Sequence, residues 1–144
     1  MIKLPDLRID NYITVYPEST APQIEAVTRI NGGDAAYIRT KTFKQLLSDH
    51  FEGVLITERW LFDFGFGTLD NKSFFKHSMN DIDVAVEFDA RDNSFQLLVP
   101  DQIKTYPISY YSYGKTNKYV HQLQNLYHDL TGEELILNNG CDIN

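Results

Sequence analysis

The chain has 144 residues, 42% of them apolar and 23% charged, a composition that excludes a disordered chain and is typical of a soluble globular protein. Its length is that of one ordinary domain with its own hydrophobic core. The formal net charge of −7 disfavours a protein that wraps the backbone of DNA or RNA, because such proteins neutralise phosphates with clustered Lys and Arg.

Cysteine usage and hydropathy predict where the protein resides. The single cysteine, Cys141, excludes an internal disulfide and a cysteine-based zinc site. No apolar run approaches the roughly 20 residues that span a bilayer, and the first ten residues lack the apolar stretch of a signal peptide. We therefore expect an intracellular protein that has no membrane partner.

The first fifty residues predict short strands separated by turns. Residues 7–16 and 23–30 are rich in β-branched and alternating apolar residues, and the return strand 35–40 follows an Asn-Gly-Gly-Asp turn at 31–34. We expect a strongly curved antiparallel sheet, barrel-like in this N-terminal half. Residues 42–51 carry apolar side chains at helical spacing and predict a short helix or turn.

A short helix is predicted over residues 57–64. The Thr57 hydroxyl can accept a hydrogen bond from a free amide of the first turn, and Gly65 can end the helix. Three apolar side chains share one face and are expected in the core: Trp60, Leu61 and Phe64.

Strands return after residue 72, and 81–90 with 94–100 gives the clearest hairpin. Residues 103–114 predict a further strand, placed at an edge of the sheet because Pro107 cannot donate to a β-ladder. Seven apolar side chains of the hairpin are expected on one buried face: Ile82, Val84, Val86, Phe88, Phe95, Leu97 and Val99.

An amphipathic helix is predicted over residues 118–130, ended by Gly132. Thr131 and Glu134 have the spacing of a capping box that would start one more turn. The apolar side chains fall within about 120° of arc at 100° per residue; they are Tyr119, Val120, Leu123, Leu126, Tyr127 and Leu130. The polar side carries His121, Gln122, Gln124, Asn125, His128 and Asp129.

The two histidines of this helix do not predict a metal site. Seven residues separate His121 from His128, which is roughly 10 Å at 1.5 Å per residue and too far for one ion. We predict no metal and no cofactor, and we favour a solvated helix face. The alternative is a face that binds a partner protein through His121, Gln124, Asn125 and His128.

Acidic residues concentrate between residues 63 and 101, where eight acids and three bases give a net charge of −5. Four of them share one face of the strand at 81–90: Asp81, Asp83, Glu87 and Asp89. This face can keep the sheet soluble and protect an edge, or it can bind a basic partner, even as a mimic of the nucleic-acid backbone.

Two further functions are weighed from the sequence. The tyrosines between Tyr106 and Tyr119 stand near three lysines, a combination that can stack bases and hold phosphates of single-stranded nucleic acid. His50 and His77 have no Ser or Cys beside them that is evidently placed as a nucleophile. We therefore predict no catalytic residues and no enzymatic activity.

Two segments resemble a family of small uncharacterised proteins of phages and mobile elements of gut Bacteroidetes. "LITERWLFDFGF" (55–66) is similar to the middle of that family, and "KYVHQLQNLYHDLTGEEL" (118–135) is similar to its C-terminus. The strand at 7–16 is similar to its start, and together these matches touch some 40 residues. The chain departs from the family pattern at Ile56-Thr57, where Leu-Thr is usual. The resemblance implies a phage or mobile-element context and no particular reaction.

These observations combine into one expectation. We expect a single α+β domain over residues 1–144, in which a curved antiparallel sheet carries a short middle helix and a C-terminal amphipathic helix. Its expected function is that of a non-enzymatic phage or mobile-element accessory protein, in the host cytoplasm or with the virion. It would bind a host-defence, replication or virion protein. The alternatives are an acidic nucleic-acid-mimic inhibitor, such as an anti-defence or anti-CRISPR protein, and the single-strand binder above.

Overall fold

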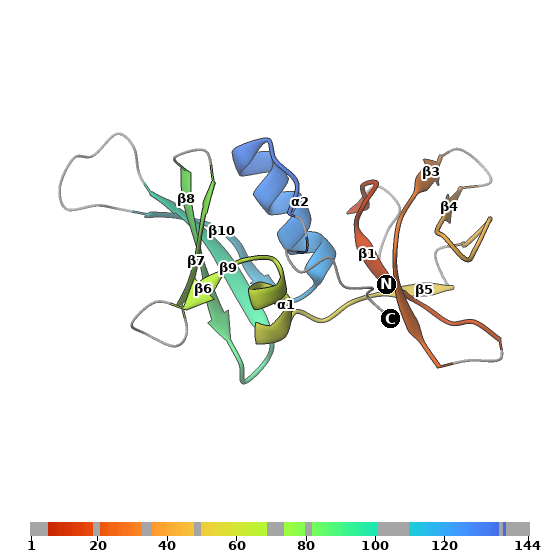
Figure 1. Cartoon of the computed structure of the whole chain (residues 1–144), viewed down its shortest axis with the longest axis horizontal. Coiled ribbons are helices and arrows are strands. Elements are labelled where there is room, and N and C mark those ends of the chain that lie inside the picture. The colour runs from red at the N-terminus through yellow and green to blue at the C-terminus, as the bar shows by residue number, and fades with distance from the viewer. Residues whose placement is uncertain are drawn as a thin grey trace. The chain divides into compact units, whose positions relative to one another are not determined.

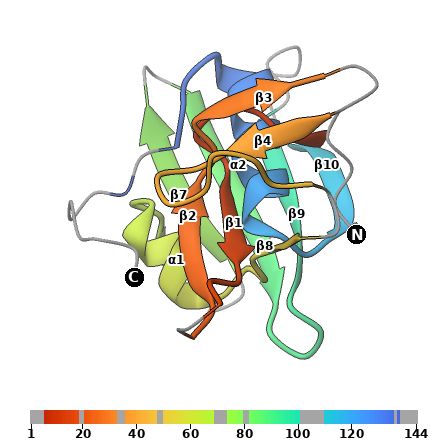
Figure 2. The same ribbon diagram turned by 90° about the vertical axis from the view of Figure 1, so that its right-hand side faces the viewer.

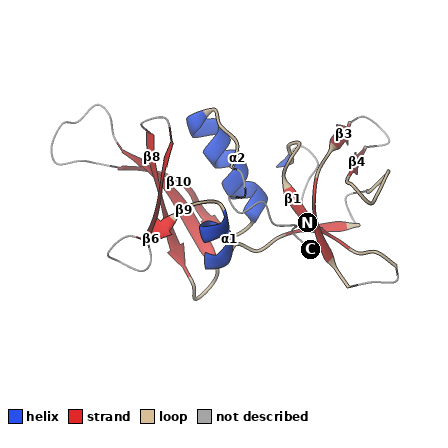
Figure 3. Cartoon of the chain, viewed as in Figure 1, coloured by secondary structure: helices blue, strands red, loops and turns tan. Residues whose placement is uncertain are grey.

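The computed structural model has antiparallel sheets and two helices, which confirms the α+β class (Figures 1 and 3). It describes residues 6–18, 21–32, 36–47, 50–68, 74–79, 82–100, 110–135 and 137.

The described residues form two compact units. Unit 1 holds those up to Leu55 together with Tyr119–Asn125, and unit 2 holds those of Ile56–Lys118 and those from Leu126 onward. One helix therefore contributes residues to both units, so the division does not coincide with a single break in the chain. The prediction of one domain over residues 1–144 stays a prediction.

Unit 1 contains two small antiparallel sheets. The first has the strand order β2-β1-β5 and consists of β1 (Tyr12–Val15), β2 (Gln23–Ala26) and β5 (Phe51–Gly53). The second is a hairpin of β3 (Arg29–Asn31) and β4 (Tyr37–Arg39) (Figure 2). The described strands are not closed into a barrel, so the expected barrel-like half is wrong.

The single strand expected over 23–30 divides because its backbone changes partners at residues 27 and 28. The Val27 amide donates to the Asn11 carbonyl, and the Thr28 amide donates to the Arg39 carbonyl, each at 2.8 Å. The alternation of apolar residues continues across this point, which is why the sequence alone predicts one strand. The sheets therefore stay separate.

The helix or turn expected over 42–51 is not a helix in its described part. Leu46 forms an antiparallel bridge with Ile38, with N···O distances of 3.0 and 2.9 Å, and β5 begins at Phe51. Residues 48–49 lie outside the described residues. Leu46 thereby joins the buried apolar cluster of unit 1, which consists of Leu7, Ile13, Val15, Val27, Ile38, Leu46 and Phe51.

One carboxylate lies on the core side of the three-stranded sheet. Glu25 stands directly opposite Ile13, is buried, and accepts hydrogen bonds from the Thr42 amide at 3.2 Å and the Thr42 hydroxyl at 2.5 Å. Burial by itself raises the pKa of Glu25, but the hydrogen bonds from Thr40 and Thr42 outweigh it and lower that pKa. The bonds thus satisfy an ionised group that would otherwise destabilise the core.

Unit 2 is built on a five-stranded antiparallel sheet with the order β10-β9-β8-β7-β6 (Figure 1). Its strands are β6 (Gly67–Thr68), β7 (Phe74–Met79), β8 (Ile82–Asp89), β9 (Ser94–Pro100) and β10 (Tyr110–Asn117). The sheet order places β10 at an edge, as predicted, although Pro107 lies outside the described residues.

The predicted β8–β9 hairpin is confirmed. Val86 stands opposite Leu97 and Phe88 stands opposite Phe95, and all four side chains are buried together with Val84. The side chains of Ile82 and Val99 lie outside the described residues. Cross-strand apolar pairs of this kind stabilise sheets. They require an apolar residue at every second position, which is why the alternation in the sequence predicts this hairpin.

Helix α1 (Glu58–Asp63) begins as the sequence predicts. The Thr57 hydroxyl accepts from the Trp60 amide at 3.4 Å, and Gly65 follows the helix with a φ of 96°. Leu61 and Phe64 are fully buried, whereas Trp60 is half-buried against the Phe64 ring, with ring centroids 5.6 Å apart.

Helix α2 (Val120–Thr131) lies within two residues of its predicted bounds, and Gly132 follows it with a φ of 76°. The expected capping box is wrong, because no helical turn follows over 132–135. The Thr131 hydroxyl instead donates back to the Tyr127 carbonyl at 2.7 Å and accepts from the Glu133 amide at 3.1 Å. Neither described helix is long and apolar enough to cross a membrane.

Gly53 provides a test of the packing in unit 1. A Cβ atom at this position would lie 2.7 Å from Cδ1 of the Tyr119 ring, next to the bridge between Leu55 and Tyr119. We expect Gly53→Ala to lower the free energy of unfolding by about 1–3 kcal/mol, because the ring or the strand must shift. Urea unfolding followed by circular dichroism measures this change.

The matched control is Gly32→Ala, in the same unit, where a Cβ would meet no atom within 4 Å and the backbone is not left-handed. Its stability should stay within about 0.5 kcal/mol of the wild type. Equal losses in the two variants would contradict the close approach of Tyr119 to Gly53.

Candidate partner-binding surfaces

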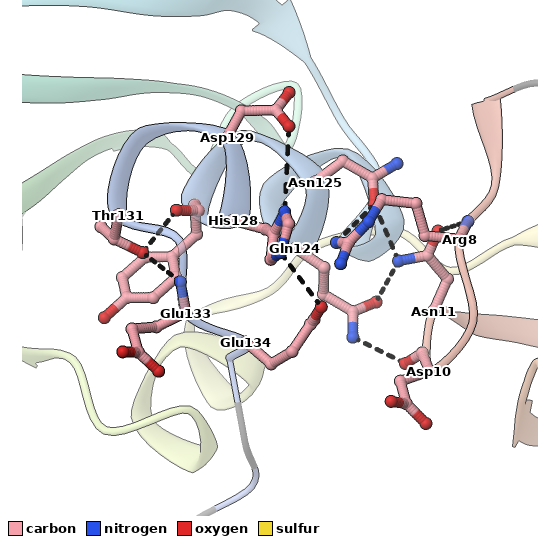
Figure 4. Close-up of polar contacts among 11 residues, drawn as sticks. Arg8, Asp10, Asn11, Gln124, Asn125, His128, Asp129, Thr131, Glu133 and Glu134 are labelled. Atoms are coloured by element: carbon pink, nitrogen blue, oxygen red, sulfur yellow. Dashed lines mark hydrogen bonds and ion pairs between the residues drawn. The ribbon is translucent and has the colours of Figure 1, made fainter.

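The polar side chain of Gln124 in α2 is buried, with only 1% of the residue exposed. Its amide nitrogen donates to the Asp10 carbonyl at 2.9 Å (Figure 4). Its Oε1 accepts from the Tyr12 backbone amide at 3.0 Å. A single carboxamide thus satisfies a backbone acceptor and a backbone donor at the start of β1. These bonds hold the helix to that strand from within unit 1.

Asn125 and Asn11 extend this attachment along the segment before β1. The Asn11 amide nitrogen donates to Asn125 Oδ1 at 3.0 Å, and the Asn125 amide nitrogen donates to the Asp6 carbonyl at 2.7 Å. Asn11 Oδ1 accepts from the Arg8 amide at 2.7 Å, and the Arg8 guanidinium lies 3.5 Å from Asn125 Oδ1 (Figure 4). We call Asn11, Gln124 and Asn125 the amide cluster.

The expectation of a solvated helix face is therefore wrong for His121 and Gln124, which are buried. Asn125 is half-buried and bound, whereas His128 is 38% exposed and Asp129 is 72% exposed. The physical reason is that the backbone around Asp10 and Tyr12 supplies partners for an amide, so its burial leaves no donor or acceptor unmet. Gln124 is more than 110 residues away in sequence from the Asp10 and Tyr12 backbone that it binds, so no local pattern predicts these bonds.

His121 is the one buried polar group of the described chain with an orphaned atom. Its side chain is 3% exposed, its ring stacks on Tyr119 with centroids 5.8 Å apart, and its Nδ1 has no hydrogen-bond partner there. Burial lowers the pKa of His121 to about 4, an effect that the nearby charge of Asp6 partly opposes. The imidazole is therefore neutral near pH 7.

The pKa of His121 predicts how stability depends on pH. Because the folded-state pKa is about 4 and the ordinary value is 6.5, the unfolded chain takes up the proton first. The stabilisation is complete above pH 6.5 and is lost as the pH falls toward 4. The loss should be roughly 3 kcal/mol, at 1.36 kcal/mol per pKa unit. Urea unfolding at a series of pH values measures it.

His121→Leu should remove most of this dependence between pH 6.5 and 4, whereas the exposed control His128→Leu should retain it. The same slope in wild type and His121→Leu would contradict a buried neutral imidazole.

At the other end of α2, in unit 2, His128 faces carboxylates. Its Nδ1 lies 4.0 Å from the Asp129 carboxylate, and its Nε2 lies 3.8 Å from that of Glu134 (Figure 4). No three His, Cys, Asp or Glu side chains among the described residues are grouped so as to hold a metal ion. The exposed part of the predicted helix surface is thus acidic around one histidine.

The predicted acidic strand face is described only in part. Asp81 and the side chain of Asp83 lie outside the described residues. The Glu87 carboxylate accepts from the side-chain Nε2 of Gln96 at 2.9 Å, and the Asp89 carboxylate lies 2.7 Å from the Arg91 guanidinium. The alternation of side chains along the strand predicts that Glu87 and Asp89 share a face. It does not predict that each carboxylate has a local partner.

The turn between β8 and β9 fixes its charges in place. The Asp92 carboxylate accepts from the Ser94 amide at 3.0 Å and from its hydroxyl at 2.6 Å, and these bonds lower the pKa of Asp92. The Arg91 guanidinium and amide hold the pKa of Asp89 at about 2. Both carboxylates are therefore ionised near neutral pH, with one cation between them.

Most of the tyrosine cluster lies outside the described residues. Tyr106 and the side chains of Tyr110, Tyr111 and Tyr113 lie outside them, whereas Tyr119 is exposed and stacks on His121. A single-strand site built on these tyrosines stays a prediction.

Removing the Gln124 amide should destabilise the protein strongly. Gln124→Met keeps the shape of the buried side chain but leaves the Asp10 carbonyl and the Tyr12 amide, which are partly buried, without the bonds that they make to it. We expect a loss of about 2–4 kcal/mol in the free energy of unfolding, measured with urea. Asp129→Ala, on the exposed side of the same helix, should change stability by less than about 0.5 kcal/mol. A near-neutral Gln124→Met would contradict the structural role of the amide.

Comparisons of the chain with protein-family models, with curated proteins and with solved structures found no match.

Proposed function

We propose that the protein is a non-enzymatic accessory protein of a phage or mobile element that binds a basic surface of another protein. The observation that carries the proposal is the uneven charge of the two units. Residues 56–118 and 126–140 contain twelve acidic and seven basic residues, so unit 2 accounts for −5 of the net −7. The resemblance of residues 55–66 and 118–135 supports the phage or mobile-element context.

The β8–β9 turn supports this proposal because its charges are held before any partner arrives. Asn93 has a φ of 59°, and its side-chain amide donates to the Ile56 carbonyl at 2.9 Å, which anchors the turn. A preorganised loop loses little conformational freedom on binding, so more of the interaction energy contributes to affinity. Glu87, Asp89 and Asp92 are the proposed contacts here.

The end of α2 supplies further carboxylates to the same unit. Asp129 is well exposed, and Glu134 and His128 lie beside each other. By contrast, the amide cluster is occupied by bonds within unit 1. Of the partner surface predicted from the sequence, Glu87, Asp89 and His128 are thus retained, and we add Asp92 and Asp129. Asp81 and Asp83 stay predictions, because their side chains lie outside the described residues.

An acidic inhibitor that mimics nucleic acid would use the same carboxylates, and it remains the alternative proposal. Both functions weaken with salt, because both depend on exposed charge. A competition experiment with DNA distinguishes the two functions. A short DNA duplex should displace the protein from a partner whose nucleic-acid groove it occupies, and it should not displace the protein from another basic surface.

The test is affinity capture from a lysate of a gut Bacteroidetes host, followed by mass spectrometry. We expect Asp89→Asn/Asp92→Asn to weaken retention of the captured protein on the order of ten-fold, because two exposed charges that face the partner are removed. Binding of that purified protein to wild type and variant, measured by biolayer interferometry at two salt concentrations, gives the number.

The matched control is Glu18→Gln/Glu52→Gln, which removes two exposed carboxylates from unit 1 and changes the net charge equally. It should bind as the wild type does. If both double variants lose the same affinity, net charge and not the β8–β9 turn governs binding, and the assigned surface is wrong. If no protein is retained through charge at low salt, the proposed function itself is wrong.

A further inference from the structure

A basic segment stands out in unit 1 of this acidic chain. Residues 26–47 contain four basic side chains and one acidic residue, Asp34, in a protein whose net charge is −7. The basic side chains are Arg29, Arg39, Lys41 and Lys44. They belong to the β3–β4 hairpin and to the chain that follows it, and Arg29, Lys41 and Lys44 are exposed.

The hairpin register brings the two arginines together. Arg29 stands directly opposite Arg39, and Asn31 stands opposite Tyr37. Because side chains alternate between the faces of a strand, these four residues share one face. The other face carries Ile30 opposite Ile38, which pack in the core of unit 1. Figure 2 shows β3 and β4 side by side.

The charge of this face is not neutralised within the described residues. The Arg39 guanidinium donates to the Lys44 backbone carbonyl at 3.1 Å, and neither Arg29 nor Arg39 is paired with a described carboxylate. The Glu25 carboxylate accepts a hydrogen bond from the Thr42 hydroxyl, and of these four cations only Lys41 lowers its pKa. Like charges directly opposite each other on a hairpin cost stability, so the arrangement is better explained by an anionic ligand than by folding.

We propose that this hairpin face binds single-stranded nucleic acid. Arg29 and Arg39 contact successive phosphates, with Lys41 and Lys44 beside them, and a base stacks on the Tyr37 ring. The Asn31 amide carries both a donor and an acceptor for the edge of that base. Cationic grooves combined with an aromatic platform are how proteins hold single strands with little sequence preference.

The same residues favour this ligand over other polyanions. An acidic peptide or an anionic membrane surface would be attracted by the four cations but would make no use of the Tyr37 ring and the Asn31 amide, which stand next to the arginine pair on the same hairpin face. A duplex offers phosphates but no unstacked base for Tyr37. Strands of three residues, roughly 10 Å long, suit a contact of two or three nucleotides.

The test uses the full-length protein and a fluorescein-labelled oligothymidylate of about 12 nucleotides, with fluorescence anisotropy at several salt concentrations. We expect Arg29→Gln/Arg39→Gln to weaken binding at least ten-fold and to reduce the slope of log K against log salt by about 1.4, which is about 0.7 for each lost phosphate contact. Tyr37→Leu should weaken binding by about 5- to 100-fold without changing that slope.

Two variants serve as controls. Arg59→Gln/Lys118→Gln removes two exposed cations from unit 2 and should bind the oligonucleotide as the wild type does. Tyr37→Phe retains the ring and should retain affinity. The thermal midpoint of Arg29→Gln/Arg39→Gln should be unchanged or higher, because a like-charge pair is removed, so a lost affinity cannot be ascribed to unfolding.

Several outcomes would overturn the proposal. They are no binding by the wild type at about 100 μM protein and 20 mM salt, equal binding by Arg29→Gln/Arg39→Gln, and binding to phosphatidylserine vesicles but not to the oligonucleotide. The inference is independent of the proposed function, since it involves other residues of opposite charge. Asp89→Asn/Asp92→Asn should bind the oligonucleotide normally, and Arg29→Gln/Arg39→Gln should still bind the captured protein.

Discussion

The attachment of α2 to the strand β1 depends on the carboxamide of Gln124. This side chain takes the place of a neighbouring strand, because it donates to one backbone carbonyl and accepts from one backbone amide at the start of β1. The bonds of Asn11 and Asn125 continue the attachment toward Asp6. Polar groups that are fully satisfied can be buried without a net loss of stability, and they fix orientation more narrowly than apolar contacts do. The part of α2 that belongs to unit 1 is therefore held to β1 by satisfied polar groups.

Charge is distributed unevenly over this framework. The acidic residues of unit 2 are held in a defined arrangement at the β8–β9 turn, where each carboxylate has a local donor. The two arginines of the β3–β4 hairpin, Arg29 and Arg39, stand opposite each other, and neither is paired with a described carboxylate. The hydrogen-bonded carboxylates are preorganised for the proposed protein partner, and the arginine pair is the basis of the proposed single-strand site. We thus propose two separate contacts for this small protein: an acidic surface for a basic protein and a basic surface for single-stranded nucleic acid.

Local patterns predicted local structure well. Alternation gave the β8–β9 hairpin, the Thr57 cap and Gly65 gave α1, and the apolar stripe gave α2. Features that depend on distant partners could not be predicted, because nothing near Gln124 in sequence signals that the backbone at Asp10 will receive its amide. The division of 23–30 into two strands was missed for the same reason. Of the candidate site residues, Glu87, Asp89 and His128 are on the described surface, whereas His121 and Gln124 are buried.

The backbone at Asp10 limits which substitutions the protein tolerates. Asp10 has a φ of 74°, a left-handed conformation that Gly, Asn and Asp adopt readily and that β-branched residues strongly resist. That conformation also aims the carbonyl that receives the Gln124 amide. Genetic drift at position 10 should consequently be confined to those three residue types. The side chain itself is exposed and replaceable, so this constraint comes from the peptide geometry alone.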